Sequence, residues 1–403
     1  MNTGQRRVFG AHMGAVRAGL ALLAVSVLGV GAAMPAEARS LTVLYNFAGE
    51  ADGGDPYASL IRDSAGNLYG TADYGGTAFA GAVFKVTPDG TETVLYSFSG
   101  GTDGAQPFSA LVRDKVGNLY GTTTMGGSAN AGVVFKVDAS GTESVLHNFL
   151  GGSDGTTPTG GLLADKAGNF YGTASQGGTA NAGVLFEISA KGKYSILHSF
   201  TGAANDGKYP TYTSLLSDKK GSLYGVTEEG GAANGGILYK LSKKGQLTIL
   251  HSFMGGAADG CNVLGVPFMD GKGNFYGTTS SCGTSSLGTV WKVSANGTET
   301  VLHSFAGGTS DGEYPLAGVI VDGKGNVYGN TETGGASNFG TVYEISAKGA
   351  FTLVHSFDGT DGKYPYGSFV RSKSTFFGST QNGGTIGYGT IWKISKVAAR
   401  HGK

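Results

Sequence analysis

The sequence predicts an all-β protein, a seven-bladed β-propeller of four-stranded antiparallel blades that its N-terminal strand closes. Three observations predict this fold: a long regular repeat, four short strand patterns in each repeat, and a surplus strand at one end that matches a deficit at the other. The repeats start at Leu68, Leu119, Phe170, Leu223, Phe275, Val327 and Phe376. Successive starts are 51, 51, 53, 52, 52 and 49 residues apart. So regular a period is the signature of a repeat architecture.

Each repeat contains four strand patterns, named here strands A, B, C and D. In the second repeat they cover residues 110–113, 118–123, 133–137 and 143–149. Between A and B lies the pattern Asp-x-x-Gly-Asn, as in residues 63–67, which predicts a tight hairpin with Asp capping the turn and Gly at positive φ. Another Gly-containing turn separates C from D. Short strands joined by short turns make an antiparallel meander, and this period is typical of propeller blades.

The strand count predicts how the ring closes. The first D pattern, residues 41–47, precedes any strand A, whereas the last repeat ends after its strand C, residues 391–394. The N-terminal D strand is therefore expected to complete the seventh blade, which removes the open sheet edges. A sheet solenoid with open ends is the alternative, but it leaves the surplus and the deficit unexplained. The propeller is expected to span residues 39–395, followed by a short basic tail at 396–403.

Composition excludes several classes of partner and structure. The 403 residues include 29 Lys+Arg and 29 Asp+Glu, a balance that gives no reason to expect a nucleic-acid partner. There are 74 glycines, but they recur in register, and 40% of the chain is hydrophobic. Glycine in register predicts turns at positive φ rather than a flexible polymer. With 14% charged residues, the chain does not have the composition of a disordered protein.

Residues 1–38 have the pattern of an export signal. Arginines at positions 6, 7 and 17 precede an apolar run at residues 18–33, and Ala36-Glu37-Ala38 offers a small-x-small cleavage site. The run is short for a membrane span. The adjacent arginines also fit a twin-arginine signal, so both export routes stay open. Cleavage after Ala38 removes three Arg and one Glu, leaving 26 basic and 28 acidic residues. We expect a mature protein without a membrane span, periplasmic or secreted.

The two cysteines are predicted to form a disulfide. Cys261 lies in the D–A connection of the fifth repeat, and Cys282 replaces the first Gly of that repeat's B–C loop. These two connections emerge on the same side of an up-and-down blade, and disulfides persist in exported proteins. No CxxC motif accompanies them, so a metal-binding or nucleophilic role is not expected.

Other recurring residues are expected to be structural. The aromatic residue of each strand C is expected to pack between blades. A His or Tyr recurs in strand D, and its copies lie a whole blade apart, so they cannot form one catalytic cluster. The Asp before each strand A is expected to cap its own turn, with a ring of cation-binding carboxylates as the alternative. The sequence assigns no catalytic residue, metal ligand or cofactor.

The loops on the D–A and B–C side differ most between repeats and carry aromatic and acidic residues. Because repeats 6, 7, 1 and 2 become neighbours when the ring closes, their aromatic residues are expected to form one arc suited to stacking on sugar rings. The candidate ligand-binding residues are Tyr57, Tyr74, Phe108, Tyr314, Tyr364, Tyr366 and Glu332. The same loops also carry Asp73, Tyr209, Tyr212, Glu228 and Glu229.

The motifs Leu-Tyr-Gly-Thr, Gly-Gly and Val-Phe-Lys-Val, followed by Val-Leu-Tyr-Ser-Phe, resemble the Gloeo/Verruco (GloVer) tandem repeat of bacterial "choice-of-anchor" extracellular proteins. The resemblance covers about residues 41–395 and implies export and a repeat scaffold, with no reaction assigned to any residue. The expected function is a non-catalytic binding or interaction scaffold for a glycan or an extracellular protein partner. The alternative is a carbohydrate-active propeller, such as a polysaccharide lyase or hydrolase, that uses Glu228, Glu229 or Glu332.

Overall fold

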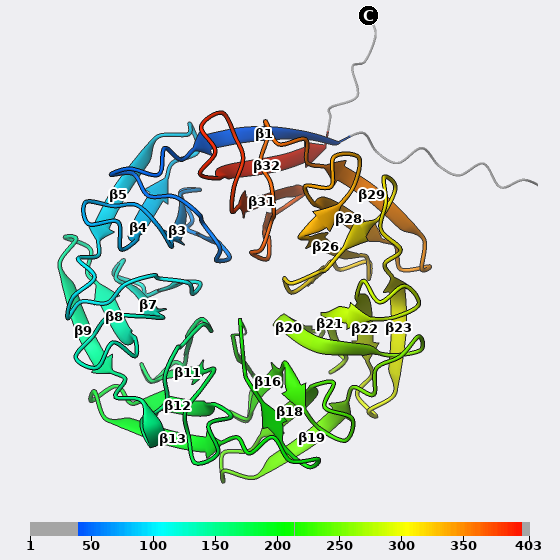
Figure 1. Cartoon of the computed structure of the whole chain (residues 1–403), viewed down its shortest axis with the longest axis horizontal. Coiled ribbons are helices and arrows are strands. Elements are labelled where there is room, and N and C mark those ends of the chain that lie inside the picture. Colours follow the sequence, from blue (N-terminus) through cyan, green and yellow to red (C-terminus); the bar gives the residue numbers. More distant parts are fainter. Residues whose placement is uncertain (1–38, 213, 397–403) are drawn as a thin grey trace, which may run out of the picture. The chain divides into compact units, whose positions relative to one another are not determined.

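The computed structural model describes residues 39–212 and 214–396. They form seven four-stranded antiparallel sheets arranged as the blades of a ring, which confirms the predicted seven-bladed β-propeller (Figure 1). Two further pairs of very short strands lie in the connections of blades 4 and 6. The predicted export signal and C-terminal tail lie outside the described residues, apart from Lys396. None of the helices in the described ranges is long and apolar enough to cross a membrane.

The strands run outward from A to D in each blade. Blade 1 consists of β2 (Ile61–Arg62), β3 (Leu68–Ala72), β4 (Ala82–Val86) and β5 (Glu92–Ser97), and blade 2 of β6 (Val112–Arg113), β7 (Leu119–Thr123), β8 (Val133–Val137) and β9 (Glu143–Asn148). Blade 3 consists of β10 (Leu163–Ala164), β11 (Phe170–Ala174), β12 (Val184–Ile188) and β13 (Tyr194–Ser199), and blade 4 of β15 (Leu216–Ser217), β16 (Leu223–Thr227), β18 (Ile237–Leu241) and β19 (Leu247–Ser252).

Blades 5 to 7 follow the same order. Blade 5 consists of β20 (Gly260–Met269), β21 (Phe275–Cys282), β22 (Thr289–Val293) and β23 (Glu299–Ser304), and blade 6 of β25 (Ile320–Val321), β26 (Val327–Thr331), β28 (Thr341–Ile345) and β29 (Phe351–Ser356). Blade 7 consists of β30 (Val370–Ser372), β31 (Thr375–Thr380), β32 (Thr390–Lys396) and β1 (Arg39–Asn46). The short pairs are β14 (Gly207–Lys208) with β17 (Glu229–Gly230) and β24 (Gly312–Glu313) with β27 (Thr333–Gly334), and the one short 3₁₀ helix of the described ranges is η1 (Gly152–Asp154).

The N-terminal strand closes the ring as predicted. Strand β1 pairs antiparallel with β32, from Arg39 opposite Lys396 to Asn46 opposite Thr390, and lies at the outer edge of blade 7 (Figure 1). The orphan D strand at one end of the sequence therefore fills the place left open at the other end.

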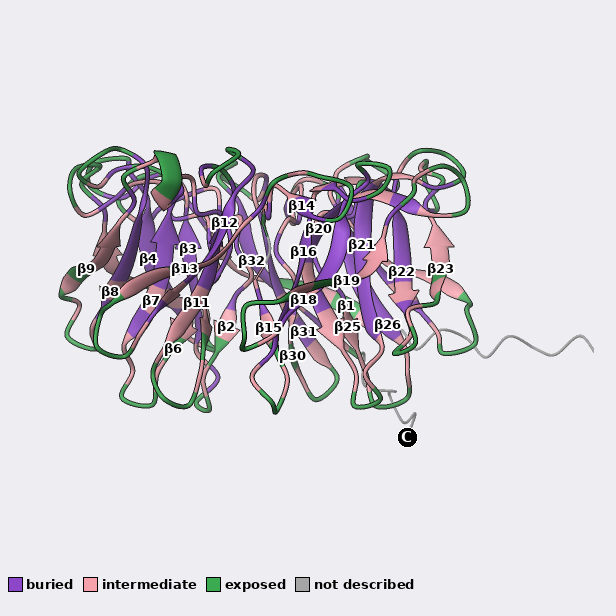
Figure 2. Ribbon diagram, turned by 90° about the horizontal axis from the view of Figure 1, so that it is seen from below, coloured by how far each residue is buried: buried purple, intermediate pink, exposed green. Residues whose placement is uncertain are grey.

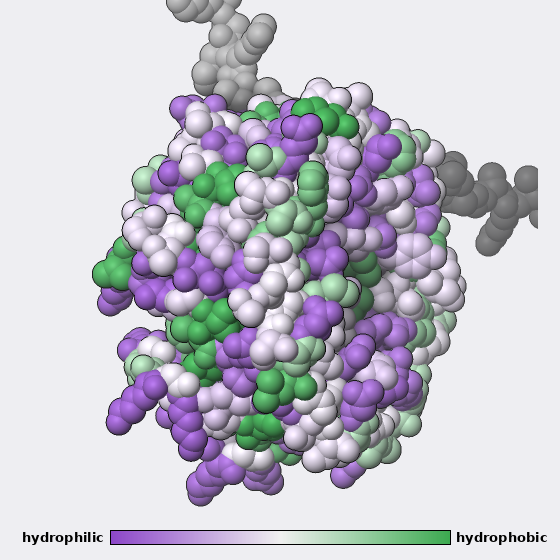
Figure 3. Space-filling model, turned by 60° about the vertical axis from the view of Figure 1, so that its left-hand side comes forward, coloured by the Kyte–Doolittle hydropathy of each residue, from purple (hydrophilic) through white to green (hydrophobic). Residues whose placement is uncertain are grey.

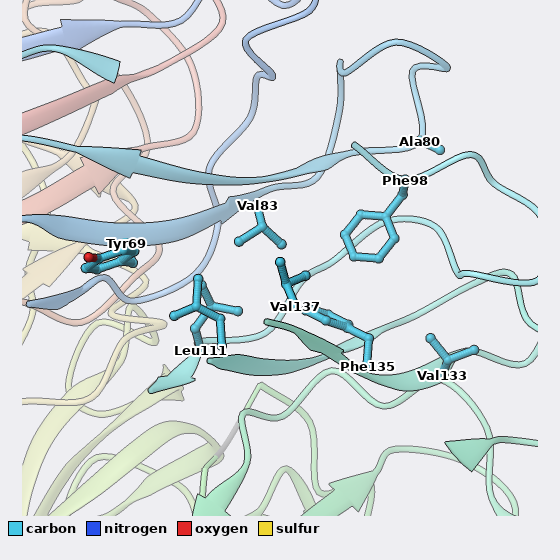
Figure 4. Close-up of a cluster of buried hydrophobic side chains, with 9 residues drawn as sticks. Tyr69, Ala80, Val83, Phe98, Leu111, Val133, Phe135 and Val137 are labelled. Atoms are coloured by element: carbon cyan, nitrogen blue, oxygen red, sulfur yellow. The ribbon is translucent and has the colours of Figure 1, made fainter. Parts of the chain in front are cut away.

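The core lies between the blades. Every strand-C aromatic residue is fully buried; in blade 2 this residue is Phe135, whose ring lies 5.0 Å from that of Phe98, directly after the outer strand of blade 1. Both belong to one cluster with residues from both blades, such as Val83 and Leu111 (Figure 4). Burying a side chain of this size contributes about 1.5–3 kcal/mol relative to leaving it exposed. The predicted packing of these aromatics between blades is confirmed.

The glycine of the Leu-Tyr-Gly-Thr motif makes room for that aromatic. Gly277 lies opposite Trp291 in the β21–β22 register, and a Cβ at Gly277 would lie 2.4 Å from the indole ring. Gly70 has the same relationship to Phe84, with a separation of 2.6 Å. Any larger residue would therefore displace the aromatic side chain on the neighbouring strand.

The two faces of the ring carry different connections (Figure 2). The A–B and C–D turns lie on what we call the hairpin face, at the bottom of Figure 2. The A–B turn forms as predicted: Asp63 accepts hydrogen bonds from the backbone and side-chain amides of Asn67, both at 2.9 Å. The D–A and B–C connections meet on the opposite face, which we call the loop face, through bridges such as Gly54 with Tyr74.

Cys261 and Cys282 form a disulfide on the loop face, as predicted, with a Cα–Cα distance of 5.4 Å. They lie on neighbouring strands β20 and β21 of blade 5. On the side of the ring shown in Figure 3, hydrophobic residues form small groups scattered among hydrophilic ones. That side therefore presents no continuous apolar surface.

Candidate functional site

A cavity of about 300 Å³ lies where the D–A connections of the seven blades converge on the loop face. One repeat position, directly after the Pro of each connection, supplies seven of its 18 lining residues, one from each blade. In blade 4 one extra residue shifts this position, and in blade 5 Val263 replaces the Pro. The residues at this position are Tyr57, Phe108, Thr159, Tyr212, Leu264, Leu316 and Tyr366.

Four aromatic rings form a continuous row along one side of this cavity. Tyr57 stacks on Phe108 with ring centroids 4.1 Å apart, and its ring lies 4.8 Å from that of Tyr366. Tyr212 extends the row beyond Phe108 at 5.5 Å and is 47% exposed. Thr159 of blade 3 accepts a hydrogen bond from the backbone amide of Tyr212 at 3.1 Å. The small Thr159 side chain thus lets aromatic residues from blades 2 and 4 meet.

The opposite side of the cavity is aliphatic, and the inner backbones of blades 5 and 6 are in contact on that side. Leu264, Val266 and Leu316 supply apolar side chains from blades 5 and 6. A Cβ at Gly318 would lie 2.1 Å from the carbonyl oxygen of Val266, so the inner backbones of blades 5 and 6 are in direct contact there. Ser368 continues this ring of contacts into blade 7, since its hydroxyl donates to the carbonyl of Gly318 at 3.2 Å.

The Thr of the Leu-Tyr-Gly-Thr motif holds the cavity wall in place. In six blades the buried side chain at this position donates to a backbone carbonyl in the D–A connection of the next blade, within three residues of the wall position; the donor is a hydroxyl in five blades and the Asn330 amide in blade 6. The donors and acceptors are Thr71 to Ser109, Thr122 to Pro158, Thr173 to Pro210, Thr278 to Ala317, Asn330 to Pro365 and Ser379 to Ala58. Blade 4 has Val226 at this position, and the connection that follows is the one carrying Cys261.

Three carboxylates surround the aromatic row. Asp73, Glu228 and Glu332 share one repeat position at the start of the B–C loop. Glu332 accepts a hydrogen bond from the Tyr366 hydroxyl at 2.5 Å. Burial, with a smaller contribution from the Asp55 carboxylate, raises the pKa of Asp73 to about 7. Burial also raises the pKa of Glu228.

The tyrosine hydroxyls of the row lie in this acidic environment. Burial, followed by the charges of Asp73 and Asp55, raises the pKa of Tyr57, whose hydroxyl accepts a hydrogen bond from the Gln381 side chain. The described residues that line the cavity include no Lys, Arg or His. The nearby Lys208 is paired with Glu229 at 2.7 Å. The cavity therefore favours neutral or positively charged groups over anions.

The structure brings some of the predicted ligand-binding residues together and separates others. Tyr57, Phe108 and Tyr366 line the cavity, and Glu332 is bonded to Tyr366. Tyr74 stacks instead with Tyr388 at 6.0 Å, outside that row.

Two more of these residues also lie apart from the row. The Tyr364 ring lies 6.3 Å from that of Phe339, and Tyr314 is a 38% exposed residue on the blade 6 connection. Tyr212 was not expected in the arc, because blade 4 is not a sequential neighbour of blades 7, 1 and 2. Its signal in the sequence is the extra residue after Pro210.

The recurring Asp before strand A pairs with the recurring Tyr or His of strand D. Tyr45 donates to Asp52 at 2.8 Å and Tyr96 to Asp103 at 2.9 Å, while in later blades a His takes this place, as in His303 with Asp311 at 3.1 Å. The same carboxylates accept backbone amides of their own turns, as expected for capping residues. These rings of residues stabilise each blade.

Comparison with solved structures shows a fold likeness at low sequence identity. The extracellular domain of a provisionally named one-component system from B. thetaiotaomicron has a TM-score of 0.50 at 10% identity over 84% of this chain and 38% of that one. A provisionally named gluconolactonase has a TM-score of 0.38 at 12% identity. The match covers 65% of this chain and 80% of that one. A provisionally named 6-phosphogluconolactonase from Bacteroides uniformis has a TM-score of 0.48 at 15% identity. The match covers 74% of this chain and 84% of that one.

Comparison with curated proteins gives no match. The Gloeobacter/Verrucomicrobia repeat matches residues 25–217 and 211–400, which together span nearly the whole chain. The resemblance seen in the repeat motifs is therefore confirmed. The chain belongs to the Gloeobacter/Verrucomicrobia repeat family.

Proposed function

We propose that this protein is an exported, non-catalytic carbohydrate-binding propeller whose ligand enters the cavity on the loop face. The observation that carries the proposal is the row of four aromatic rings, Tyr366, Tyr57, Phe108 and Tyr212, along one wall of that cavity. Aromatic faces and edges suit the apolar face of a sugar ring, and the surrounding hydroxyls and carboxylates suit its hydroxyl groups. A scaffold of this kind needs no catalytic constellation.

The size and charge of the cavity narrow the ligand class. A volume of about 300 Å³ lies at the lower end of the range of about 300–1,000 Å³ for ligand pockets, so the cavity suits the end of a glycan rather than a long segment. The carboxylates of Asp73, Glu228 and Glu332 disfavour acidic sugars at this site. A neutral or amino sugar at a chain end is the ligand that fits these properties.

The disulfide Cys261–Cys282 supports export, because such bonds persist in oxidising compartments. The near balance of acidic and basic residues gives no reason to expect nucleic-acid binding. We therefore place the mature protein in the periplasm or the medium.

A carbohydrate-active enzyme is the second candidate, and Asp73 is the observation that favours it. Its pKa of about 7 suits a general acid at neutral pH, and its Oδ1 atom is buried without a hydrogen-bond partner among the described residues. The charge that further raises this pKa comes from another carboxylate, Asp55, whose own pKa is raised by burial. In contrast, Glu229 is engaged by Lys208 and Glu332 by Tyr366.

A glycan array followed by titration of the best ligand tests the proposal. We expect Tyr212→Ala to weaken binding about tenfold or more, since Tyr212 is the most exposed ring of the row. Tyr314→Ala is the matched control: both tyrosines are exposed, lie on D–A connections and have positive φ, of 51° and 54°. Equal losses in the two variants would contradict a site at the cavity.

Product analysis on the same ligand separates binding from turnover. The proposal expects the ligand to be recovered intact, and Asp73→Asn to leave its affinity within a few-fold of the native value. Release of a shorter sugar that Asp73→Asn abolishes would establish the enzyme instead.

A further inference from the structure

The hairpin face carries a second candidate site, a groove of about 980 Å³ between blades 2 and 3. Tyr120 of blade 2 and Phe170 of blade 3 lie in it with ring centroids 4.5 Å apart. Four basic residues also line it: Arg113, Lys115, Lys136 and Lys166. The groove and the cavity on the loop face lie on opposite sides of the ring and share no residue.

One repeat position in the groove holds a small residue, Ala164. In blades 1, 2 and 7 the second residue of strand A is Arg, and its guanidinium lies over an aromatic ring of the preceding blade. Arg113 lies over Tyr69 at 5.4 Å, and Arg62 lies over Phe377 at 5.5 Å. Blade 3 has Ala164 at this position. No side chain of that length therefore covers Tyr120, the equivalent of Tyr69 in blade 2.

Exposure follows the size of the covering residue at six of the seven blade interfaces; at the seventh, Phe377 is partly buried although Arg62 lies over it. Four of the strand-B tyrosines are buried, with at most 8% exposed: Tyr69, Tyr224, Tyr276 and Tyr328. At the covering position of strand A in the next blade, they have Arg, Met, Val and Arg, respectively. Tyr120 and Tyr171 are only partly buried, and at the covering position of the next blade they have the smaller residues Ala164 and Ser217. The aromatic surface in the groove is thus available to a ligand.

The charge of the groove is positive. Besides the four basic residues, the groove is lined by two carboxylates, Asp114 and Asp165. Both are engaged in their own hairpins; Asp114, for example, accepts the Asn118 side-chain amide at 2.7 Å. At the next interface, between blades 3 and 4, Glu187 takes the place of Lys136. The combination of open rings and a cationic wall is therefore found at blades 2 and 3.

We propose that this groove binds a segment of an anionic polysaccharide, a sugar chain that carries carboxylate or sulfate groups. A sugar ring packs on Tyr120 and Phe170, while its anionic groups face the side chains of Lys115, Lys136 and Lys166. A volume near the upper limit of about 1,000 Å³ for ligand pockets suits an extended segment rather than a single small anion. The two faces would then recognise different sugars, anionic ones on the hairpin face and neutral or amino sugars on the loop face.

Ala164→Arg is the decisive variant, because it restores the arginine of blades 1, 2 and 7 and should cover Tyr120. It adds a positive charge, so simple electrostatic attraction predicts tighter binding, whereas occupancy of the groove predicts binding at least tenfold weaker. Ser217→Arg is the matched control, with the same added charge at the equivalent position of blade 4. It should leave binding unchanged or slightly tighter.

The probes are polygalacturonate oligomers and dextran sulfate, with neutral dextran as the negative control, titrated calorimetrically at low and near-physiological salt. We expect both anionic probes to bind, with an affinity that falls as salt rises. Lys115→Gln with Lys166→Gln should weaken binding about tenfold and reduce the salt dependence. Both lysines are exposed, so this variant is expected to fold even where Ala164→Arg does not.

Three results would overturn the proposal: tighter binding by Ala164→Arg, equal effects of Ala164→Arg and Ser217→Arg, or binding to anionic lipid vesicles with none to either polysaccharide. Loss of neutral-sugar binding at the loop face leaves this outcome unchanged, since the two sites are tested with different ligands and different variants.

Discussion

Thr122 of β7 donates its hydroxyl to the carbonyl oxygen of Pro158 at 2.9 Å, and thereby ties blade 2 to the connection that enters blade 3. The next residue along the chain, Thr159, belongs to the wall of the loop-face cavity. Equivalent bonds recur at five other blade interfaces. The Thr of the Leu-Tyr-Gly-Thr motif therefore links a strand in the core of one blade to the cavity wall supplied by the next.

Replacement of this hydroxyl should weaken both the fold and the site. Thr122→Val keeps the side-chain shape but leaves the Pro158 carbonyl without its donor, so we expect a loss of about 1–2 kcal/mol in the free energy of unfolding. Chemical denaturation measures it. Thr93→Val, at an exposed position of β5, is the control and should change stability by less than about 0.5 kcal/mol. Equal effects would show that the bond to Pro158 contributes nothing.

The fold could be predicted from the sequence because its determinants are local and repeated. The turn formed by Asp63 and Asn67 and the close approach of Gly70 to Phe84 are each encoded within about twenty residues. The closure by β1 could be predicted by counting strands. Each of these features requires only the repeat itself and a partner at fixed spacing.

The candidate site could be predicted only in part, because it depends on how blades meet across the ring. Tyr57, Phe108 and Tyr366 come from sequential neighbours and could be grouped in advance. Tyr212 reaches Phe108 past blade 3 because Thr159 is small and blade 4 has an extra residue. No pattern within one repeat encodes that contact.

The groove on the hairpin face illustrates a different limit. The sequence shows Ala164 where blades 1, 2 and 7 have Arg, but it does not show that this Arg lies over an aromatic ring of the preceding blade. Only the packing of adjacent blades turns a small residue into an open surface.

Removal of the disulfide should destabilise blade 5. The bond joins residues 21 apart in sequence, for which loss of the cross-link costs about 3 kcal/mol in the free energy of unfolding. We expect Cys261→Ser to show this loss, measured by denaturation without reductant. Cys282→Gly should lose about 1 kcal/mol less, because Cys282 has φ of 64°, at a position where the other repeats have glycine.

Addition of reductant provides the control for that comparison. It should lower the stability of the native protein to that of Cys261→Ser and leave the variant unchanged. If reductant destabilised both proteins equally, or neither, the assigned stabilising role of the bond would be wrong.

Substitution of the strand-B glycine should displace the core aromatic. The Cβ of Gly277→Ala would lie 2.4 Å from the Trp291 ring, so we expect a loss of about 2–3 kcal/mol in unfolding free energy and a change in tryptophan fluorescence. Gly271→Ala is the control, since no atom lies within 4 Å of its Cβ position. A native-like fluorescence spectrum and native stability in Gly277→Ala would rule out the steric role of this glycine.

Stability should depend on pH through three glutamates between neighbouring blades, Glu92, Glu143 and Glu299. Burial, followed by the charge of the Asp in the D–A connection that enters the same blade, raises the pKa of each from 4.5 to about 7. Below about pH 4.5 these glutamates are protonated in both the folded and the unfolded state, so their ionisation does not lower the free energy of unfolding there. Between about pH 4.5 and pH 7 the unfolded chain ionises first, and stability falls.

The variant with all three glutamates changed to glutamine cannot ionise at these positions. Thermal unfolding across this pH range should therefore give curves that nearly coincide below about pH 4.5 and diverge above it, with the variant more stable by about 1 kcal/mol per site at neutral pH, a value reduced for solvent screening. Glu50→Gln, an exposed side chain, should follow the native curve. If the triple variant were less stable than the native protein at neutral pH, the ionised glutamates would have to stabilise the blade interfaces rather than oppose their packing.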